Sequence, residues 1–427
     1  MNSREDDAKA RGTAEAVARR SYGKLVAFLA ARTRDVAAAE DALSEAFASA
    51  LADWPGNGCP SNPEAWLLTV ARRKFIDMAR RRHSNGIEDE DPLQMAAVLT
   101  ASPPEDEIPD RRLALMFACA HPAIDSGIRA PLILQVILGL DAATIASAFL
   151  MSPTAMGKRL VRAKSKIRES GIPLRIPDIE ELPGRLDTVL DAIYAAFAEG
   201  WSDAAGTDIG RRDLTSEAFF LARLVVELLP NEPDALGLLA LMLHAEGRRH
   251  ARRSENGEYV PLADQDPALW DSAMIDEAEA LLFQASTFRT ISRYQLEAAI
   301  QSAHVYRRRT GRANWEAVLK LYDALFAITG SPVVAINRAL VIAELQGAHV
   351  ALEALPSPTT ERRLAEYQPY WAARADLLAR SGSVDEAHHA YEIAIGLERE
   401  SSVRRFLERR QRRCRVDPLA KFSVASR

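Results

Sequence analysis

Apolar residues recur at helical spacing along most of this chain, and no other feature constrains its fold as strongly. Between Val36 and Trp54 the apolar side chains stand at relative positions 0, 7, 11, 14 and 18, on one face of a helix. Alanine and leucine dominate the composition and runs of β-branched residues are scarce, which favours helices over strands. The sequence therefore predicts an all-α fold. At about 150 residues per domain, 427 residues suggest two to four domains.

Charge is segregated along the chain, although the net charge is only −5. Residues 72–82 hold six Arg or Lys against one Asp, and residues 157–168 hold six with no acid. Residues 88–110 hold eight acids, several prolines and no base, which is typical of a linker. Prolines gather again at residues 171–185. We therefore expect a first helical module, an acidic linker, a second helical module and a long C-terminal helical domain, at residues 10–83, 84–110, 111–171 and 183–412.

In the first module Asp35 is a plausible N-cap for a helix from Val36 to Trp54. Four polar residues fall away from the apolar stripe and make an acidic face: Glu40, Asp41, Ser44 and Glu45. Residues 55–63 are expected to form a loop, and the Pro63-Glu64 pair then opens the next helix.

That next helix begins apolar and ends basic. Leu67, Ala71, Phe75 and Met78 line one side, while Arg72, Arg73, Lys74, Arg80, Arg81 and Arg82 occupy the others. A solvated helix end accounts for one or two of these charges, since bases suit the C-terminal dipole. Six charges favour a phosphate-facing surface. Trp66 can either stack on a nucleic-acid base or pack in the core, and its place beside the apolar side favours the core.

The second module has the pattern of a helix-turn-helix. Gly139 is a good helix-ending residue, Asp141 can cap a short helix, and Ser152-Pro153 can start a further one. In this last helix Met156, Leu160, Ala163 and Ile167 share one face, and Lys158, Arg159, Arg162 and Lys166 project opposite. A basic membrane-surface helix could mimic part of this pattern, but the two capped starts and the preceding short helix favour DNA binding.

These residues resemble a bacterial sigma factor of the extracytoplasmic-function type. "AAEDALSEAFASAL" resembles the helix that docks on the clamp of RNA polymerase, and "PEAWLLTVARRKFIDMARRR" resembles the segment that recognises and melts the minus-ten element. "LDAATIASAFLMSPTAMGKRLVRAKSKIRE" resembles the helix-turn-helix that reads the minus-thirty-five element. The rest of the chain is similar to a subgroup with a fused C-terminal domain related to tetratricopeptide repeats, through strings such as "SPVVAINRAL" and "RADLLARSGSVDEAHHAY".

The resemblance implies that the chain works by binding core RNA polymerase and promoter DNA. Glu40, Asp41, Ser44 and Glu45 would meet the polymerase, and the basic residues of the 63–83 helix would hold DNA as its strands separate. Near the start of the last helix, Thr154, Ala155, Lys158 and Arg159 would reach base edges. Arg162 and Lys166 would hold phosphates.

The C-terminal half shows a repeat period of its own. Gly382, Ala387, Tyr391 and Ala394 follow the small and large pattern of a tetratricopeptide hairpin. Gly347 lies 35 residues before Gly382, and Tyr322 lies 69 residues before Tyr391, about two periods. Stacked hairpins form a concave surface suited to a protein or peptide ligand, so we expect a regulatory role. The alternative is a domain that only stabilises the two modules before it.

Other classes of protein are less compatible with this sequence. No stretch has the roughly 20 apolar residues of a membrane span and the N-terminus has no apolar signal segment, so we expect a cytoplasmic protein without membrane partners. The three cysteines are too scattered for a disulfide framework or zinc cluster, and no metal or other cofactor is expected. The acids of "DQDPALWD" lie near His250, but without a nucleophile and base they favour a loop packed through Trp270 over an enzyme site. The main alternative function is a conventional helix-turn-helix regulator with a C-terminal sensor domain.

Overall fold

A computed structural model describes residues 2–84, 111–148, 151–178, 181–202, 209–358, 362–398 and 400–416. Across these residues every regular element is a helix, which confirms the predicted all-α class. The chain divides into two compact units. The first comprises Met1–Ser202 and Asp208–Leu224, and the second comprises Asp203–Thr207 and Val225–Arg427. The predicted linker 84–110 lies outside the described residues apart from Ser84.

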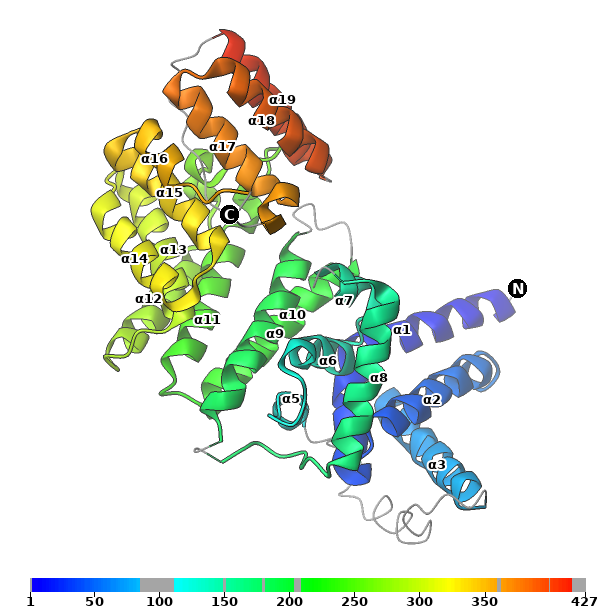
Figure 1. Cartoon of the computed structure of the whole chain (residues 1–427). Helices are drawn as coiled ribbons and strands as arrows, with labels where there is room; N and C mark the ends of the chain where they lie inside the picture. Colours follow the sequence, from blue (N-terminus) through cyan, green and yellow to red (C-terminus); the bar gives the residue numbers. More distant parts are fainter. Residues whose placement is uncertain are drawn as a thin grey trace. The chain divides into compact units, whose positions relative to one another are not determined.

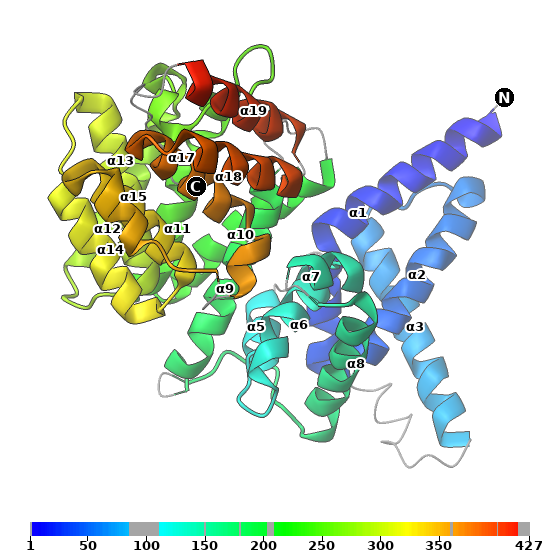
Figure 2. The same cartoon turned by 45° about the horizontal axis from the view of Figure 1, so that its top comes forward.

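The first unit contains α1 to α9 and most of α10 (Figures 1 and 2). Its first three helices contact one another and contain the predicted docking and basic segments: α1 (Asn2–Thr33), α2 (Val36–Asn57) and α3 (Pro63–Ser84). The next helices include the predicted helix-turn-helix: α5 (Arg112–Cys119), α6 (Ser126–Leu138), α7 (Ala142–Ala148) and α8 (Pro153–Glu169). The last two are α9 (Pro183–Ser202) and α10 (Ile209–Leu228).

The two predicted modules of this unit pack directly against each other. Helix α1 contacts both α5 and α6, and α2 contacts α8. Gly23 of α1 lies so close to α6 that a Cβ there would stand 2.0 Å from the Ile137 carbonyl oxygen, so only glycine permits this approach. Leu25 and Leu29 of α1 and Leu132 of α6 are fully buried. The modules therefore form a single compact body in this conformation.

Helices α9 and α10 belong to this body, although the sequence placed them in the C-terminal domain. Helix α9 contacts α5 and α6, and it buries a stripe of Leu186, Val189, Leu190, Ile193 and Phe197. Arg112 at the start of α5 forms an ion pair with Glu217 of α10 and lies 4.4 Å from the centre of the Phe220 ring. Helices α9 and α10, which begin after residue 171, therefore pack on the helices of the first two predicted modules.

The second unit is a chain of helices in which each packs on the next. Its α-helices are α11 (Pro233–Glu246), α12 (Ser272–Ser286), α13 (Arg293–Thr310), α14 (Trp315–Thr329), α15 (Pro332–Gln346), α16 (Ala348–Ala354), α17 (Gln368–Ser381), α18 (Val384–Leu397) and α19 (Ser401–Val416). Neighbours contact in order from α11·α12 to α18·α19. Short 3-10 turns occur at η1 (Arg249–Arg252), η2 (Leu262–Asp264), η3 (Pro267–Leu269) and η4 (Arg362–Glu366).

The residues expected from the repeat pattern lie at the crossings of these helices. Gly382 ends α17 with a left-handed φ of 88°, while Ala387, Tyr391 and Ala394 of α18 are buried in one cluster. Tyr322 is buried in α14. Trp270 packs against Ala251, Leu262, Ile275 and Val305, as expected for the "DQDPALWD" loop. No helix among the described residues is long and apolar enough to span a membrane.

Candidate nucleic-acid interface

The acidic face of α2 is set by the cap that starts the helix. Asp35 has an extended backbone, and its Oδ1 accepts a hydrogen bond from the Ala38 amide at 3.0 Å, which confirms the predicted N-cap. Most of the predicted apolar stripe is buried, namely Val36, Leu43, Ala50 and Trp54. Three of the four predicted polymerase-binding residues are consequently exposed, namely Asp41, Ser44 and Glu45. They form an exposed, acidic strip on α2, in which Glu45 pairs with Lys74 of α3.

Glu40 differs from these three because α8 covers it. Its carboxylate Oε2 lies 2.5 Å from Nζ of Lys164, and the two side chains are only 12% and 13% exposed. Burial raises the pKa of Glu40, while the charge of Lys164 opposes that rise. In this conformation Glu40 therefore pairs with α8 and is largely covered.

A second link joins the same two helices. Arg168 of α8 lies 3.3 Å from Oδ2 of Asp35, the carboxylate whose other oxygen caps α2. Lys164 and Arg168 are four residues apart, so both project from one side of α8. The sequence prediction missed these two bases as a pair because their acidic partners are more than a hundred positions away.

On α3 the basic residues divide into an outward and an inward group. Arg73 and Arg80 are exposed, and Arg80 lies 3.8 Å from Asp77. Arg72 is half-buried, with its guanidinium 5.5 Å from the centre of the Phe28 ring. Lys74 is half-buried and pairs with Glu45 of α2 at 3.2 Å. Arg81 and Arg82 belong to the last turn of α3, and their side chains lie outside the described residues.

The loop before α3 is shorter than expected. The prediction of a loop from residue 55 is wrong at its start, because α2 continues through Pro55 to Asn57. Pro55 has no amide hydrogen to donate to the preceding turn. Because only two helical residues follow it, the missing hydrogen bond affects just the end of α2. Trp66 meets the buried Trp54 edge to face with ring centres 5.5 Å apart. This contact favours the packing role over base stacking for Trp66.

Helix α8 has the geometry expected of the second helix of a helix-turn-helix. Ser152 caps it by accepting a hydrogen bond from the Ala155 amide at 3.3 Å, and Asp141 caps α7 through the Ala143 and Thr144 amides. Gly139 ends α6 in the left-handed region, as predicted. The predicted apolar residues Met156, Leu160, Ala163 and Ile167 are those that α8 buries.

The predicted DNA-contacting residues of α8 lie on its outer side. Thr154, Lys158, Arg162 and Lys166 are exposed. Arg159 is partly covered, with Nη2 3.0 Å from Oδ1 of Asp125, the residue that caps α6. Arg159 thus joins α8 to the start of α6, while Lys158 and Arg162 face solvent. The exposed bases of this surface can bind a polyanion such as nucleic acid.

Comparisons with known proteins give two matched segments. Residues 17–85 match the model of sigma-70 region 2, which covers α2, α3 and much of α1. Residues 185–286 match a family of unknown function (DUF6596), which begins in α9 and continues into the second unit. The chain is 38% identical over 373 residues to "Uncharacterized protein R00370" of Rhizobium meliloti (strain 1021), covering 85% of this chain and 87% of the relative. No solved structure matches the chain.

Proposed function

Because the chain belongs to the family of the Rhizobium meliloti protein R00370 and carries a sigma-70 region 2, we propose that it is an extracytoplasmic-function sigma factor. The sigma-70 region 2 supports a role in transcription initiation and implies binding to core RNA polymerase and promoter DNA. The single observation that carries the proposal is the coincidence of this matched region with the acidic strip on α2 and the basic face on α3.

Within this proposal α2 docks on the polymerase clamp through Asp41, Ser44 and Glu45. Their exposure and their acidic character suit a basic surface, and the buried stripe beneath them keeps the helix straight and fixed. Glu40 joins the same strip only when α2 and α8 separate, because Lys164 covers it in the closed conformation. Docking on polymerase thus competes with the packing of α8 on α2.

DNA would be bound in two places. Arg73 and Arg80 on α3 neutralise phosphates at the minus-ten element, assisted by Arg72, Lys74, Arg81 and Arg82. On α8, Thr154, Lys158 and Arg159 read base edges of the minus-thirty-five element, and Arg162 and Lys166 hold its phosphates. Engaging both elements at once requires the modules to separate, and the chain between α3 and α5 keeps them tethered.

The second unit is proposed to be a tetratricopeptide-like domain that regulates the sigma modules. Its consecutive packed helices and the buried small and aromatic residues at the α17·α18 crossing support this assignment. A protein or peptide ligand of this domain would be the regulatory input. The rival function is a conventional helix-turn-helix regulator, which would bind its operator alone and make no use of the acidic strip on α2.

Run-off transcription tests the proposal. Purified core RNA polymerase is given genomic DNA fragments with and without the full chain, and new discrete start sites appearing only with the chain would support the sigma role. Binding to core polymerase is measured in parallel. Strong operator binding by the chain alone, with no binding to core polymerase, would favour the conventional regulator.

A further inference from the structure

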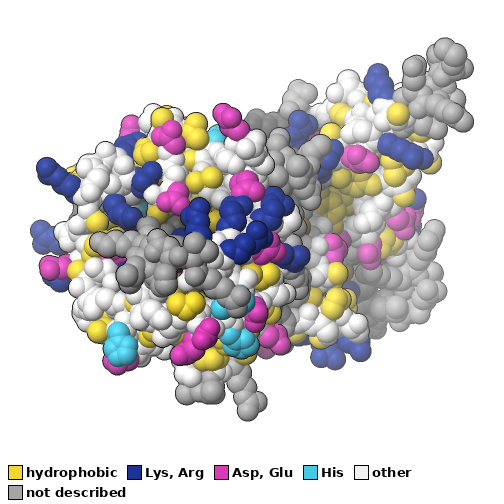
Figure 3. Space-filling view, turned by 90° about the horizontal axis from the view of Figure 1, so that it is seen from above, with side chains coloured by type: hydrophobic (Ala, Val, Ile, Leu, Met, Phe, Trp, Pro, Cys, Tyr) yellow, Lys and Arg dark blue, Asp and Glu magenta, His cyan; other side chains and the backbone are white. Residues whose placement is uncertain are grey.

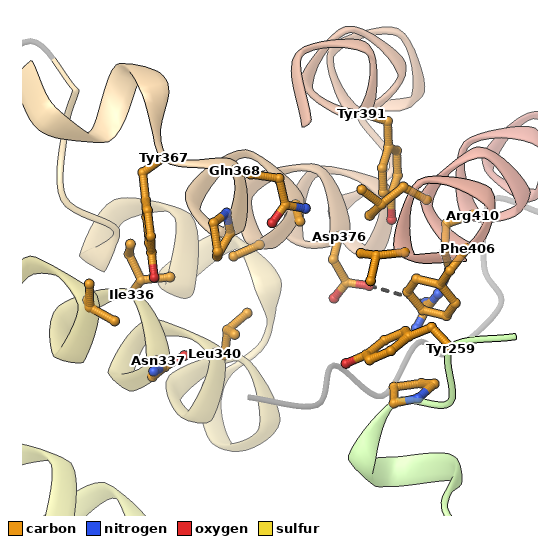
Figure 4. Close-up of a pocket in the computed structure, with 17 residues that line it drawn as sticks. Tyr259, Ile336, Asn337, Leu340, Tyr367, Gln368, Asp376, Tyr391, Phe406 and Arg410 are labelled. Carbon is orange, nitrogen blue, oxygen red and sulfur yellow. Dashed lines mark hydrogen bonds and ion pairs between the residues drawn. The ribbon is translucent and has the colours of Figure 1, made fainter. Parts of the chain in front are cut away.

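The second unit contains a cavity of about 130 Å³ between α15, α17, α18, α19 and the segment that carries Tyr259 (Figure 4). Its wall is mostly apolar and aromatic, formed by residues such as Ile336, Leu340, Tyr367 and Phe406. A dry cavity of about 150 Å³ accepts a benzene molecule in another protein, so this one admits a single ring or a branched aliphatic group. The apolar part of the cavity is therefore sized for one apolar side chain, and Asp376 and Arg410 line its polar end.

One charged group in the wall is almost completely buried and has an unused oxygen. Asp376 of α17 is 2% exposed, and its Oδ2 accepts no hydrogen bond from any residue that the structure describes. Its Oδ1 lies 3.5 Å from Nη1 of Arg410 on α19, at the limit of a hydrogen bond, and Figure 4 shows the two side chains pointing toward one another. Burial raises the pKa of Asp376 to about 7 against the opposing effects of Arg410 and Arg380. The carboxylate is thus poorly compensated in the empty cavity.

The charge of Asp376 is compensated only when its neighbours Arg380, Arg410 and Glu344 are counted together. Arg380 lies 3.8 Å from Oδ2 of Asp376 without a hydrogen bond, and its closer partner is Glu344 of α15 at 2.8 Å. With Asp376 ionised, Asp376, Glu344, Arg380 and Arg410 carry no net charge. A ligand with a net charge would leave one charge uncompensated in this buried place, whereas a zwitterion would not.

We propose that this cavity binds a free apolar α-amino acid. The ammonium group pairs with the carboxylate of Asp376, the ligand's carboxylate meets the guanidinium of Arg410, and the side chain fills the apolar part near Ile336 and Leu340. Guanidinium and carboxylate match in shape and charge, so the Asp376–Arg410 pair can hold both ends of one amino acid. The site lies wholly within the second unit, so the inference does not depend on the sigma role.

Calorimetric titration of the full chain with L-leucine and L-phenylalanine tests the proposal. Two analogues of leucine remove one charge each: leucinamide keeps the ammonium without the carboxylate, and 4-methylpentanoate keeps the carboxylate without the ammonium. At least one of the two amino acids is expected to bind, and for leucine each analogue should bind roughly tenfold more weakly or worse. Leucinamide binding as well as leucine would overturn the proposal in favour of a peptide N-terminus. Absence of amino-acid binding at millimolar concentrations would also overturn it.

Three variants distinguish an effect on the cavity from a general effect on folding. Asp376→Asn removes the negative charge with little change of shape and is expected to weaken leucine binding roughly tenfold or more. Glu353→Gln makes the same change on an exposed acid of α16 outside the cavity and should leave binding unchanged. Val333→Trp, at a partly exposed position on the cavity wall, blocks the cavity without touching Asp376. Folded Val333→Trp protein that still binds the amino acid would place the ligand elsewhere and overturn the proposal.

Discussion

Glu40 on α2 and Lys164 on α8 are 124 positions apart in the sequence and form an ion pair 2.5 Å long beneath the surface of the first unit. The pair connects a proposed polymerase-binding residue to the proposed minus-thirty-five reader. Asp35 and Arg168 add a second, more exposed link one turn further along α8. Together the two pairs close the modules on each other, and they can be altered without touching either hydrophobic core.

Reversing the charge of Lys164 should open the closed conformation. Lys164→Glu places a carboxylate against the buried Glu40, which costs roughly 3 kcal/mol of closing free energy, within the range for breaking a buried pair. Amide exchange should rise at the α2·α8 contact, and core polymerase should bind more tightly, by up to about a hundredfold, as the closed state is lost. Hydrogen exchange and a polymerase-binding titration measure the two effects.

The matched control is Lys166→Glu, the same change on an exposed position of α8. It should leave both measurements near the wild-type values. The charge-swapped double variant, Glu40→Lys with Lys164→Glu, should close the modules again while weakening polymerase binding. Faster exchange with unchanged polymerase affinity would show that closure does not control docking.

Arg73 and Arg72, although adjacent, should respond differently to alanine. Arg73 is exposed and should act on DNA, so Arg73→Ala should lower the salt dependence of promoter binding by about one released counterion and leave the melting temperature unchanged. Arg72 packs over Phe28, so Arg72→Ala should lower the melting temperature. Promoter binding by the polymerase complex at several salt concentrations, with thermal unfolding of the chain alone, distinguishes them. A similar salt effect and similar stability for both variants would contradict the assignment.

Cutting the chain after Gly171 should destabilise the first unit, whereas cutting after Leu224 should not. The shorter protein loses α9, whose buried Leu186, Leu190 and Phe197 each contribute about 1.5–3 kcal/mol of hydrophobic burial. It also loses Glu217, the partner of Arg112. Urea unfolding followed by circular dichroism should therefore give a clearly lower unfolding free energy for the protein ending at 171. Equal stability of the two truncated proteins would show that α9 and α10 are dispensable to this unit.

Acid should destabilise the second unit through His244 and His304. Burial, reinforced by nearby arginines, lowers the pKa of His244 to about 3 and that of His304 to about 4. The carboxylate of Glu279 lies 3.6 Å from His244 but is partly exposed, and it does not offset burial. Both folded pKa values lie below the unfolded value of about 6.5, so stability is complete above pH 6.5 and falls as the pH drops toward 3.

For His244 alone this linkage amounts to about 2 kcal/mol of unfolding free energy at pH 5. His244→Leu should flatten the pH profile between 6.5 and about 4, while His349→Leu, at an 86% exposed position of α16, should not. Chemical unfolding at a series of pH values measures the difference. A profile with His244→Leu as steep as that of the natural chain would contradict the predicted burial.

The sequence predicted those parts of the structure that depend on near neighbours. The caps at Asp35, Asp141 and Ser152 and the buried stripe of α8 follow from residues within a few turns of each other, where spacing alone decides the outcome. Lys158, Arg162 and Lys166 are exposed as predicted, whereas Arg159, predicted to project with them, is partly covered and pairs with Asp125. Their contacts with DNA remain predictions.

Features that depend on distant residues were not predictable in the same way. Nothing near Lys164 distinguishes it from Lys166, yet one is covered by α2 and the other is exposed. The border between the units by their contacts also differs from the expected border. The prolines between residues 171 and 185 indicate a break in the helices but not which core the next helix joins. Tertiary packing decides both questions, and local sequence patterns carry little information about it.

The position of α9 and α10 has a consequence for how such proteins can exchange parts during evolution. A gene fusion that supplied only the residues from Val225 onward would leave α5 and α6 uncovered, since their cover comes from α9. A fusion carrying α9 and α10 along would bring a helix whose buried side chains fit one particular α5 and α6. A fused segment that includes α9 and α10 is therefore longer than the second unit itself. In a chimaera of two relatives that is joined ahead of Pro183, where α9 begins, α5 and α6 should come from the same relative as α9.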